Sequence, residues 1–578
     1  MNKNVFLLAL VICASVITTN AQVLNKTTTF KLGGLGRSIV TSDKLAGDLV
    51  QGDTITPKKG LGGYTLFDLN MDLTINKIFN ANTIMRIKNP FGSFYGQNTF
   101  FEFRQLQFRG QIGRNLKYEV GDIYIGDMTK YTVYNSNDPS ANRFESDVFK
   151  LRRNILEYEN FVVGNKWRLQ GVQLNYGIDS VSIFQHINLN LFGVRTNATN
   201  DLETPDRIFF GGRLNLIQSE KFRIGFNAVD FSDLAVSQSN IKMSNNVYTI
   251  DGAYTWQNDN LLLGVGFEGG VSSYSYSKTF TDSSNSKDDY FYQPEIRAGF
   301  KPAKIMLSAS YRNVGANFNS PTAQTQRVNS QANPAIFPLV NQNTTARTPM
   351  MFDRLTNESS YNRSISQTLG VFLPQYGNIT PYGQATPNRV GLSLGLATDT
   401  SLKNFAAEVQ VDVLSEINGE FTLDLRQFTG VRAGGMINIG GLAKMNRLIS
   451  ITGGFRNEHT KRDGNLAVDF KSNIVDLGLT VETLRKVDLV VGVKMLTAKG
   501  NEYLTIRNSL NAVATFNPTV NTYLYDGSEN IYSAGLRFRF ADFAQASVIY
   551  NSSQVIRNNT SNANYQFNQL FMSFILKF

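Results

Sequence analysis

The segment FDLNMDLTIN, residues 67–76, alternates strictly between apolar and polar side chains. Successive side chains of a β-strand point to opposite faces, so this alternation predicts a strand with one apolar and one polar face. The apolar face carries Phe67, Leu69, Met71, Leu73 and Ile75. Such a face packs on a second sheet in a soluble sandwich and faces lipid in a membrane barrel, so the fold depends on which of the two covers it.

The same alternation recurs along the chain. FAAEVQVDV (405–413), FTLDLRQ (421–427) and GLRFRF (535–540) each predict a strand of this kind. In FFEFRQLQFRGQIG (100–113) the apolar positions change phase near Arg104 and Gln105. A β-bulge adds one residue to a strand and returns the following apolar side chains to the same face of the sheet, so a bulge is predicted there.

The breaks between these strands alternate in length, and this distinguishes the two folds. Long segments rich in Asn, Ser, Thr, Asp and Gly separate ten short breaks, near residues 78–80, 114–116, 178–181, 217–221, 257–259, 302–304, 399–404, 440–446, 483–486 and 541–543. Short turns on one rim and long loops on the other are typical of an outer-membrane β-barrel, and a sandwich gives no reason for them. With a first strand near 28–41 and a last at 566–578, the pattern predicts an all-β, antiparallel transmembrane barrel of about 22 strands (18–24), with short periplasmic turns and long extracellular loops.

The N-terminus predicts export. Lys3 precedes the apolar run VFLLALVICASVI, which is too short to span a bilayer, and Ala21 ends a plausible cleavage site. Residues 1–21 are therefore predicted to be a signal peptide, and residues 22–578 a single barrel. The only cysteine, Cys13, lies inside the signal, so the mature chain has no thiol chemistry.

The chain ends in QLFMSFILKF, in which alternate positions are apolar and the last residue is phenylalanine. This resembles the C-terminal assembly signal of Gram-negative outer-membrane β-barrels. The whole mature chain resembles a porin-like barrel of Bacteroidota type. The resemblance implies localisation in the cell outer membrane, contact with its lipid and lipopolysaccharide, and insertion by the barrel-assembly machinery. The predicted assembly signal consists of Leu570, Met572, Phe574, Leu576 and Phe578.

The composition fits this interpretation. Charged residues make up 18% of the chain, below the roughly 25% usual for soluble proteins, and the net charge is +10. A mild positive excess suits an anionic membrane surface. The basic residues are not clustered, so no nucleic-acid partner is predicted.

Two loops are much longer than the others, at about 128–166 and 319–390. The second holds seven of the fourteen prolines, which are poor strand formers. Strand pattern begins within about ten residues of the mature N-terminus, so no separate plug domain is predicted. A barrel of about 22 strands is wide and needs a plug. The loop at 319–390 is the best internal candidate, although it fits docking to another outer-membrane protein or a lipoprotein equally well.

The sequence contains no recognisable catalytic motif. His186 alternates with apolar residues and is predicted to face the lumen, and His459 is predicted to lie in a loop, so neither has an evident catalytic partner. No enzyme activity, cofactor or resident metal is therefore predicted. The open question is whether Glu408, Asp412, Asp424 and Arg426, expected on adjacent strands, pair with one another or hold a divalent cation.

The polar faces of the strands predict a lumen lined by both signs of charge. One interpretation is that these charges line a water-filled path and tune the passage of solutes. The other is that they pair across strands and only keep the interior hydrated. The predicted lumen-lining residues are Asp68, Asp72, Arg213, Glu295, Arg297, Arg312, Glu408, Asp412, Asp424, Arg426, Lys494, Arg537 and Arg539.

Two functions remain open. The first is a porin-like channel for passive passage of small hydrophilic solutes. The second is a non-enzymatic barrel subunit of an outer-membrane complex for secretion, barrel assembly or nutrient uptake, which docks its partners through the long loops.

Overall fold

The structure is a computed structural model of the chain. It describes residues 28–48, 61–76, 78–91, 99–133, 144–161, 167–197, 206–234, 241–278, 283–324, 346–347, 370–371, 373–398, 402–504, 516–561 and 563–578. The predicted signal peptide lies outside these ranges, as does most of the segment 325–372 in the second long loop.

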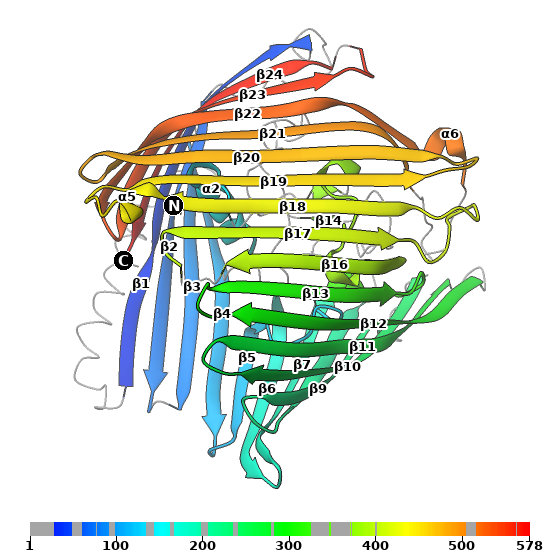
Figure 1. Cartoon of the computed structure of the whole chain (residues 1–578). Helices are drawn as coiled ribbons and strands as arrows, with labels where there is room; N and C mark the ends of the chain where they lie inside the picture. The colour runs from blue at the N-terminus through cyan, green and yellow to red at the C-terminus, as the bar shows by residue number, and fades with distance from the viewer. Residues whose placement is uncertain are drawn as a thin grey trace.

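Twenty-two strands form one antiparallel sheet, and β1 pairs with β24 to close it into a barrel (Figure 1). Each strand is hydrogen-bonded to the next strand of the barrel along the chain. The predicted fold and strand number are confirmed. The strands are β1 (Thr28–Gly47), β2 (Leu61–Ile75), β3 (Phe79–Pro90), β4 (Phe100–Ile112), β5 (Leu116–Ile125), β6 (Trp167–Val181), β7 (Phe184–Asn197), β8 (Arg207–Ile217), β9 (Phe222–Asp233), β10 (Ile241–Gln257), β11 (Leu261–Lys278), β12 (Ser283–Phe300), β13 (Ile305–Val314), β16 (Arg389–Thr398), β17 (Phe405–Ser415), β18 (Gln427–Asn438), β19 (Ile449–Arg462), β20 (Val468–Leu484), β21 (Val487–Tyr503), β22 (Thr522–Ala541), β23 (Ala544–Arg557) and β24 (Tyr565–Lys577).

The connections alternate in length as predicted. One rim carries turns as short as residues 485–486 and 542–543, and its longest connection, 439–448, contains the small helix α5 (Ile439–Leu442). All ten short connections lie within a few residues of the predicted breaks. The opposite rim carries the long loops, including 126–166 and 315–388.

Side chains alternate between the two faces of the wall. On β2, Phe67 is 42% exposed on the outer face and Asp68 is 1% exposed on the inner face. The predicted bulge is confirmed, because the β3–β4 register shifts between Ile84 and Met85. The extra residue allows Arg104 and Gln105 to point inward together.

Two local predictions are wrong. Residues 421–426 are not a strand, since β17 ends at Ser415 and β18 begins only at Gln427. The backbone between them is held as a loop, with Glu416 donating its N–H to the Arg426 carbonyl over 2.9 Å. His459 is not in a loop but within β19, where its Nε2 lies 2.9 Å from Oδ1 of Asp469 on the neighbouring strand.

The barrel closes at the chain terminus. The Gly34 N–H donates to the Phe578 carbonyl over 2.8 Å, and the Phe578 N–H donates back to the Gly34 carbonyl over 3.2 Å. The Phe578 ring stacks on Phe67 with centroids 5.3 Å apart. Phe574 and Phe578 are exposed on the outer face. Phe571 belongs to the alternate set of positions that points inward, and it is buried.

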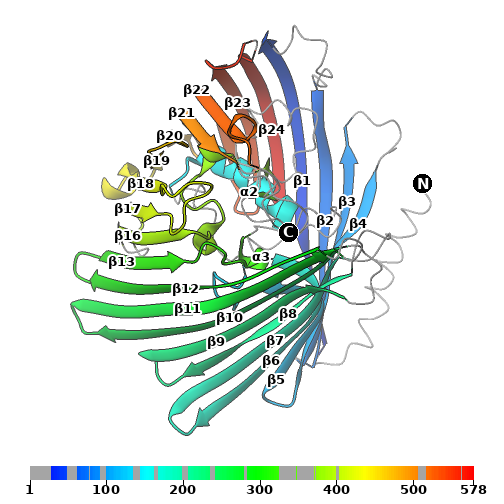
Figure 2. The ribbon, with the colours of Figure 1, turned by 90° about the vertical axis from the view of Figure 1, so that its right-hand side faces the viewer.

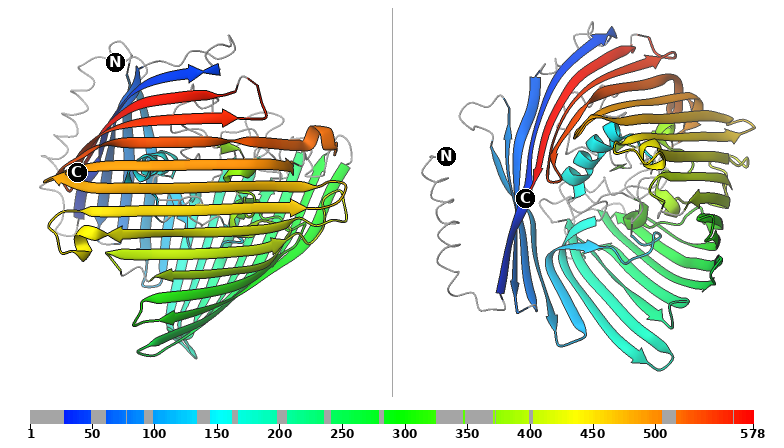
Figure 3. Two further views of the ribbon diagram at one scale, coloured as in Figure 1. Left: turned by 45° about the horizontal axis from the view of Figure 1, so that its top comes forward. Right: turned by 60° about the vertical axis from the view of Figure 1, so that its left-hand side comes forward.

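Parts of the long loops lie inside the barrel. Figure 2 and the right panel of Figure 3 show α2 (Asp147–Phe161) within the ring of strands. The short helix α3 (Pro321–Gln324) and the 3-10 turns η7 (Pro374–Tyr376) and η8 (Gly383–Ala385) come from the second long loop. The remaining elements of the described ranges are the strand pair β14 (Ala346–Arg347) and β15 (Gly370–Val371) and the helix α6 (Pro518–Asn521). Within the described ranges, no helix is long and apolar enough to cross a membrane.

A candidate solute pathway through the barrel lumen

Eleven of the thirteen predicted lumen-lining residues lie at inward-facing strand positions. They are Asp68, Asp72, Arg213, Glu295, Arg297, Arg312, Glu408, Asp412, Lys494, Arg537 and Arg539. Arg426 comes one residue before β18 and is also buried inside. Asp424 is misplaced by the sequence pattern, because it lies in the exposed loop 416–426 and not in the wall.

The inward charges are mostly paired. Arg213 donates to both carboxylate oxygens of Asp251 at 2.7 and 2.8 Å, and Asp412 accepts from Arg432 over 2.6 Å and from Ser393 over 2.6 Å. Pairing lowers the cost of burying charge and gives the wall a fixed polar surface. The predicted cluster of Glu408, Asp412, Asp424 and Arg426 is therefore not formed, since Asp412 and Arg426 have other partners.

The amphipathic helix α2 packs on the inner wall through one face. Val148, Leu151 and Ile155 follow the three- and four-residue spacing of a helix, and Val148 and Ile155 are buried. Asp147 lies in the first turn, where a carboxylate interacts favourably with the helix dipole. The helix thus has one face suited to the wall and an N-terminus suited to a charged partner.

The N-terminal end of α2 is attached to β20, β21 and β22 by charge. Nζ of Lys494 lies 2.8 Å from Oε1 of Glu145 and 3.1 Å from Oδ2 of Asp476. Arg537 lies 3.1 Å from Asp147 through Nη2 and Oδ2. Burial alone would raise the pKa of Glu145, but Lys494 and then Arg153 hold it below its usual range. The carboxylate therefore stays ionised against the wall.

Glycines in β20 and β21 leave the space that the N-terminal end of α2 occupies. A Cβ at Gly478 would lie 2.1 Å from Cβ of Ser146, and one at Gly492 would lie 2.4 Å from a methyl group of Val148. No side chain fits at either position while α2 stays where it is.

The middle of α2 contacts β24, and its C-terminal part contacts strands on the other side of the β24–β1 closure. Arg152 donates to Gln569 on β24, and the Tyr158 hydroxyl donates to Asp68 on β2. Arg104 on β4 donates to the Tyr158 carbonyl over 2.7 Å. Burial and the Asp68 charge raise the pKa of Tyr158 to about 12, so the phenol remains a donor at neutral pH. The helix is therefore attached to strands from β20 round to β4.

The second inward segment, residues 373–388, is attached to the wall next to α2. The Tyr376 hydroxyl donates to Glu529 over 2.8 Å, and Nδ2 of Asn378 donates to Glu502 over 2.8 Å. Ser472 donates to the Gln375 carbonyl over 2.6 Å. These contacts place residues 375–378 against β20, β21 and β22 from the inside.

The two long loops also contact each other inside the barrel. The Tyr131 ring stacks on Phe291 of β12 with centroids 3.7 Å apart. The hydroxyl of Ser320 donates to the Tyr131 carbonyl over 2.8 Å, and the hydroxyl of Thr322 donates to the Thr132 carbonyl over 2.6 Å. We call α2 with residues 126–133, 318–324 and 373–388 the inward segments.

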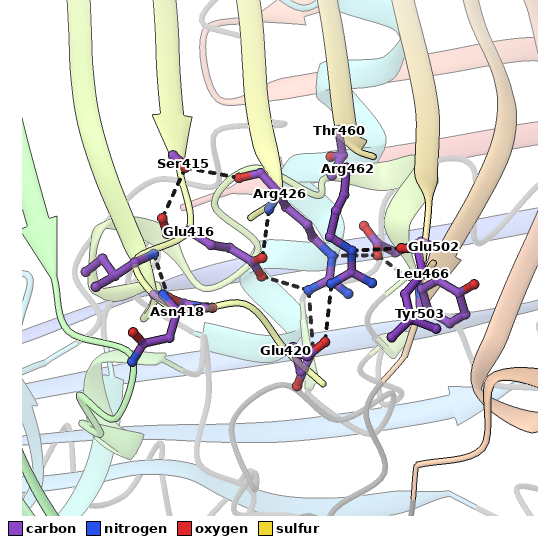
Figure 4. A network of polar contacts seen from close by, with 12 residues as sticks. Ser415, Glu416, Asn418, Glu420, Arg426, Thr460, Arg462, Leu466, Glu502 and Tyr503 are labelled. Atoms are coloured by element: carbon purple, nitrogen blue, oxygen red, sulfur yellow. Dashed lines mark hydrogen bonds and ion pairs between the residues drawn. The ribbon is translucent and has the colours of Figure 1, made fainter. Parts of the chain in front are cut away.

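A buried ionic network lies at the long-loop end of the wall. Figure 4 shows Arg426 between Glu416, Glu420 and Glu502. The ion-pair distances from Arg426 to these three carboxylates are 2.7, 3.3 and 3.0 Å. Burial alone would lower the pKa of Arg426, but Glu502 and then Glu416 hold it above its usual range. The network connects the loop 416–426 to the end of β21.

Several contact residues were missed in the sequence. Glu145 and Tyr158 lie in a loop that the strand pattern does not describe. Glu502 lies next to the end of β21, and Glu529 lies within the long strand β22. The helical spacing of apolar residues in DVFKLRRNIL, residues 147–156, is the signal that would have indicated α2.

No protein-family model and no curated protein matches the chain. Among solved structures, the copper transporter OprC aligns with a TM-score of 0.50 and 9% identity, over 95% of this chain and 80% of that one. The chain has the fold of an outer-membrane β-barrel. The ferric citrate transporter FecA aligns with a TM-score of 0.49 and 10% identity, over 94% of this chain and 78% of that one. Pseudomonas aeruginosa OccK2 (OpdF) aligns with a TM-score of 0.34 and 10% identity, over 95% of this chain and 98% of that one.

The fold locates the chain in the outer membrane. Lipid offers no hydrogen bonds, so only a closed sheet can present its outer face to it. The apolar face of residues 67–75 therefore contacts lipid. The short turns are periplasmic, and the long loops are extracellular.

Proposed function

We propose that the protein is a non-enzymatic channel for passive passage of small hydrophilic solutes, narrowed by segments of its own extracellular loops. One observation supports this most directly. The inward segments occupy the lumen, where they pack on the wall through two buried apolar clusters and through polar contacts such as Lys494–Glu145 and Tyr376–Glu529. Segments that are attached to the inner wall in both ways stay in place and reduce the cross-section of the lumen.

The periplasmic half of the lumen supports the same proposal. Arg297 on β12 and Arg109 on β4 face inward near the short turns, and both side chains remain exposed to solvent. Charged side chains that stay hydrated inside a barrel line an aqueous space. In this proposal a solute passes the inward segments at the extracellular end and then enters this wider space.

Reconstitution of the purified full-length protein tests the proposal. Proteoliposomes without an energy source should admit small neutral sugars and exclude larger ones, as measured by swelling in solutes of increasing size. Empty liposomes are the control. No uptake of any solute would contradict the channel. If another outer-membrane protein or lipoprotein also co-purified stoichiometrically, the result would favour the docking subunit.

A further inference from the structure

A cavity of about 390 Å³ lies at the extracellular end of the lumen, next to the Arg426 network. It is bounded by the inward segments 318–319 and 378–389, by the loop 416–426, and by the end of β21. Small-molecule sites usually measure about 300–1,000 Å³. This cavity is at the lower end of that range and suits a ligand of one or two small rings.

The charges that line the cavity balance. Three basic side chains, Lys287, Arg389 and Arg426, face three acidic ones, Glu416, Glu420 and Glu502. Arg426 is neutralised by its carboxylates, and Arg389 donates to backbone carbonyls, including that of Ile379 over 2.8 Å. The cavity therefore offers no net attraction to an anion or a cation, and it favours a neutral ligand.

The polar lining calls for a ligand that donates hydrogen bonds. Glu420 lines the cavity, and its side chain is 23% exposed. An ionised carboxylate only accepts hydrogen bonds. A ligand hydroxyl in the cavity would donate to it.

An aromatic surface completes the cavity. Phe421 lines it, is 42% exposed, and stacks on Phe516 with centroids 3.9 Å apart, so one face of the ring is covered. Its φ of 61° is a left-handed conformation that bulky residues rarely adopt. A strained backbone conformation persists only where the surrounding structure stabilises it. At Phe421 this conformation places an apolar ring at a polar cavity. Hydroxyls on one edge and C–H groups on the ring faces are the features of a sugar.

We propose that this cavity binds a neutral sugar of mono- or disaccharide size at the extracellular entrance. The inference deepens the proposed function, and it rests on that function only for the step in which the sugar moves on into the lumen. Binding itself depends on the cavity alone.

Calorimetric titration of the full-length protein in detergent tests the inference, with glucose and maltose as probes and glucuronate and glucosamine as charged comparators. Glucose or maltose should bind, and Phe421→Ala should weaken the binding by about tenfold or more, because it removes the aromatic surface. Leu423→Ala is the matched control, since Leu423 lies in the same loop, is 98% exposed and does not line the cavity. It should bind as the wild type does.

Three results would overturn the inference: no binding of either neutral sugar at millimolar concentration, equal binding by Phe421→Ala, or tighter binding of a charged comparator. A heat-modifiability gel shows whether Phe421→Ala is folded. Glu420→Ala provides a second variant that should also weaken binding, and it leaves Arg426 paired with Glu416 and Glu502. A barrel that admits solutes but binds no sugar overturns this inference alone. A barrel that binds sugar but admits nothing overturns the proposed function and leaves the cavity assignment standing.

Discussion

Lys494 of β21 lies 2.8 Å from Glu145, a residue 349 positions away in the first long loop, and both side chains are buried in the lumen. Lys494 also lies 3.1 Å from Asp476, so one ammonium group separates two buried carboxylates. The fully buried ionic contact between the wall and the N-terminal end of α2 therefore depends on this residue, whereas the Arg537–Asp147 pair is partly exposed.

Replacing Lys494 by methionine should destabilise the folded barrel by about 3–5 kcal/mol, because it leaves buried carboxylates without their cation. The measurement is denaturant unfolding in lipid vesicles, followed by the fluorescence of the two tryptophans. Lys499→Met is the matched control on the same strand. Its partner Asp526 lies 2.8 Å away, but the lysine is exposed and water screens the pair, so the expected loss is much smaller than for Lys494→Met. Equal losses for the two variants would show that the buried pair does not hold α2.

Acid should release α2 only at low pH. The pKa of Glu145 is lower in the folded protein than its unfolded value of about 4.3, so its ion pair is fully stabilising above that pH and is lost as pH falls through the folded value. Hydrogen exchange of the α2 amides should therefore remain slow down to about pH 4 and accelerate below it. Glu145→Gln should remove this acid-dependent step, and a release of α2 near pH 6 in the wild type would argue against the assignment.

Charge on the outer face should harm the barrel more than charge on the inner face. Val409→Arg places a guanidinium against lipid in the middle of β17, at a cost of about 2–4 kcal/mol. Gln410→Arg, the neighbouring residue, places the same group in the polar lumen near Asp412 and should be tolerated better. The readout is the fraction of heat-modifiable folded barrel in the outer membrane. Similar losses for both variants would contradict the assignment of Val409 to the lipid-facing side and of Gln410 to the lumen.

The sequence predicted the wall well, because a strand between lipid and a polar lumen must alternate at every residue. Phe67 and Asp68 follow this rule, and even the bulge at Arg104 and Gln105 is visible as a change of phase. The rule failed at 421–426, where the same alternation lies in a loop. There the side chain of Asn388 accepts from the N–H groups of Ile417 and Asn418, a contact across 29 and 30 residues that no local pattern shows.

The interior was predicted less well, because its contacts join distant parts of the chain. The pairs Tyr158–Asp68 and Asn378–Glu502 have no periodic relation in the sequence. The loop 319–390 was the candidate for closure, whereas α2 in the first long loop makes the larger set of ionic contacts among the described residues.

The terminal aromatic residues should be needed for assembly. Replacing Phe574 and Phe578 by serine removes two outer-face rings of β24, including the ring that stacks on Phe67. The double variant should accumulate outside the membrane and be degraded, as measured by its level in outer-membrane fractions. Phe543→Ser removes an exposed ring from a turn at the same end of the barrel and should leave that level unchanged. Normal levels of the double variant would contradict an assembly role for this strand.

The central claim is that the barrel is a channel whose lumen is narrowed by its own loops. Single-channel recording in planar bilayers tests it most directly, with the full-length protein compared with a variant in which residues 144–161 are replaced by a glycine–serine linker of equal length. The account predicts a small, stable conductance for the full-length protein and a severalfold larger one for the variant, because the linker removes α2 and its contacts with the wall from the lumen. Equal conductance in the two proteins, or no current from either when both are folded, would contradict it.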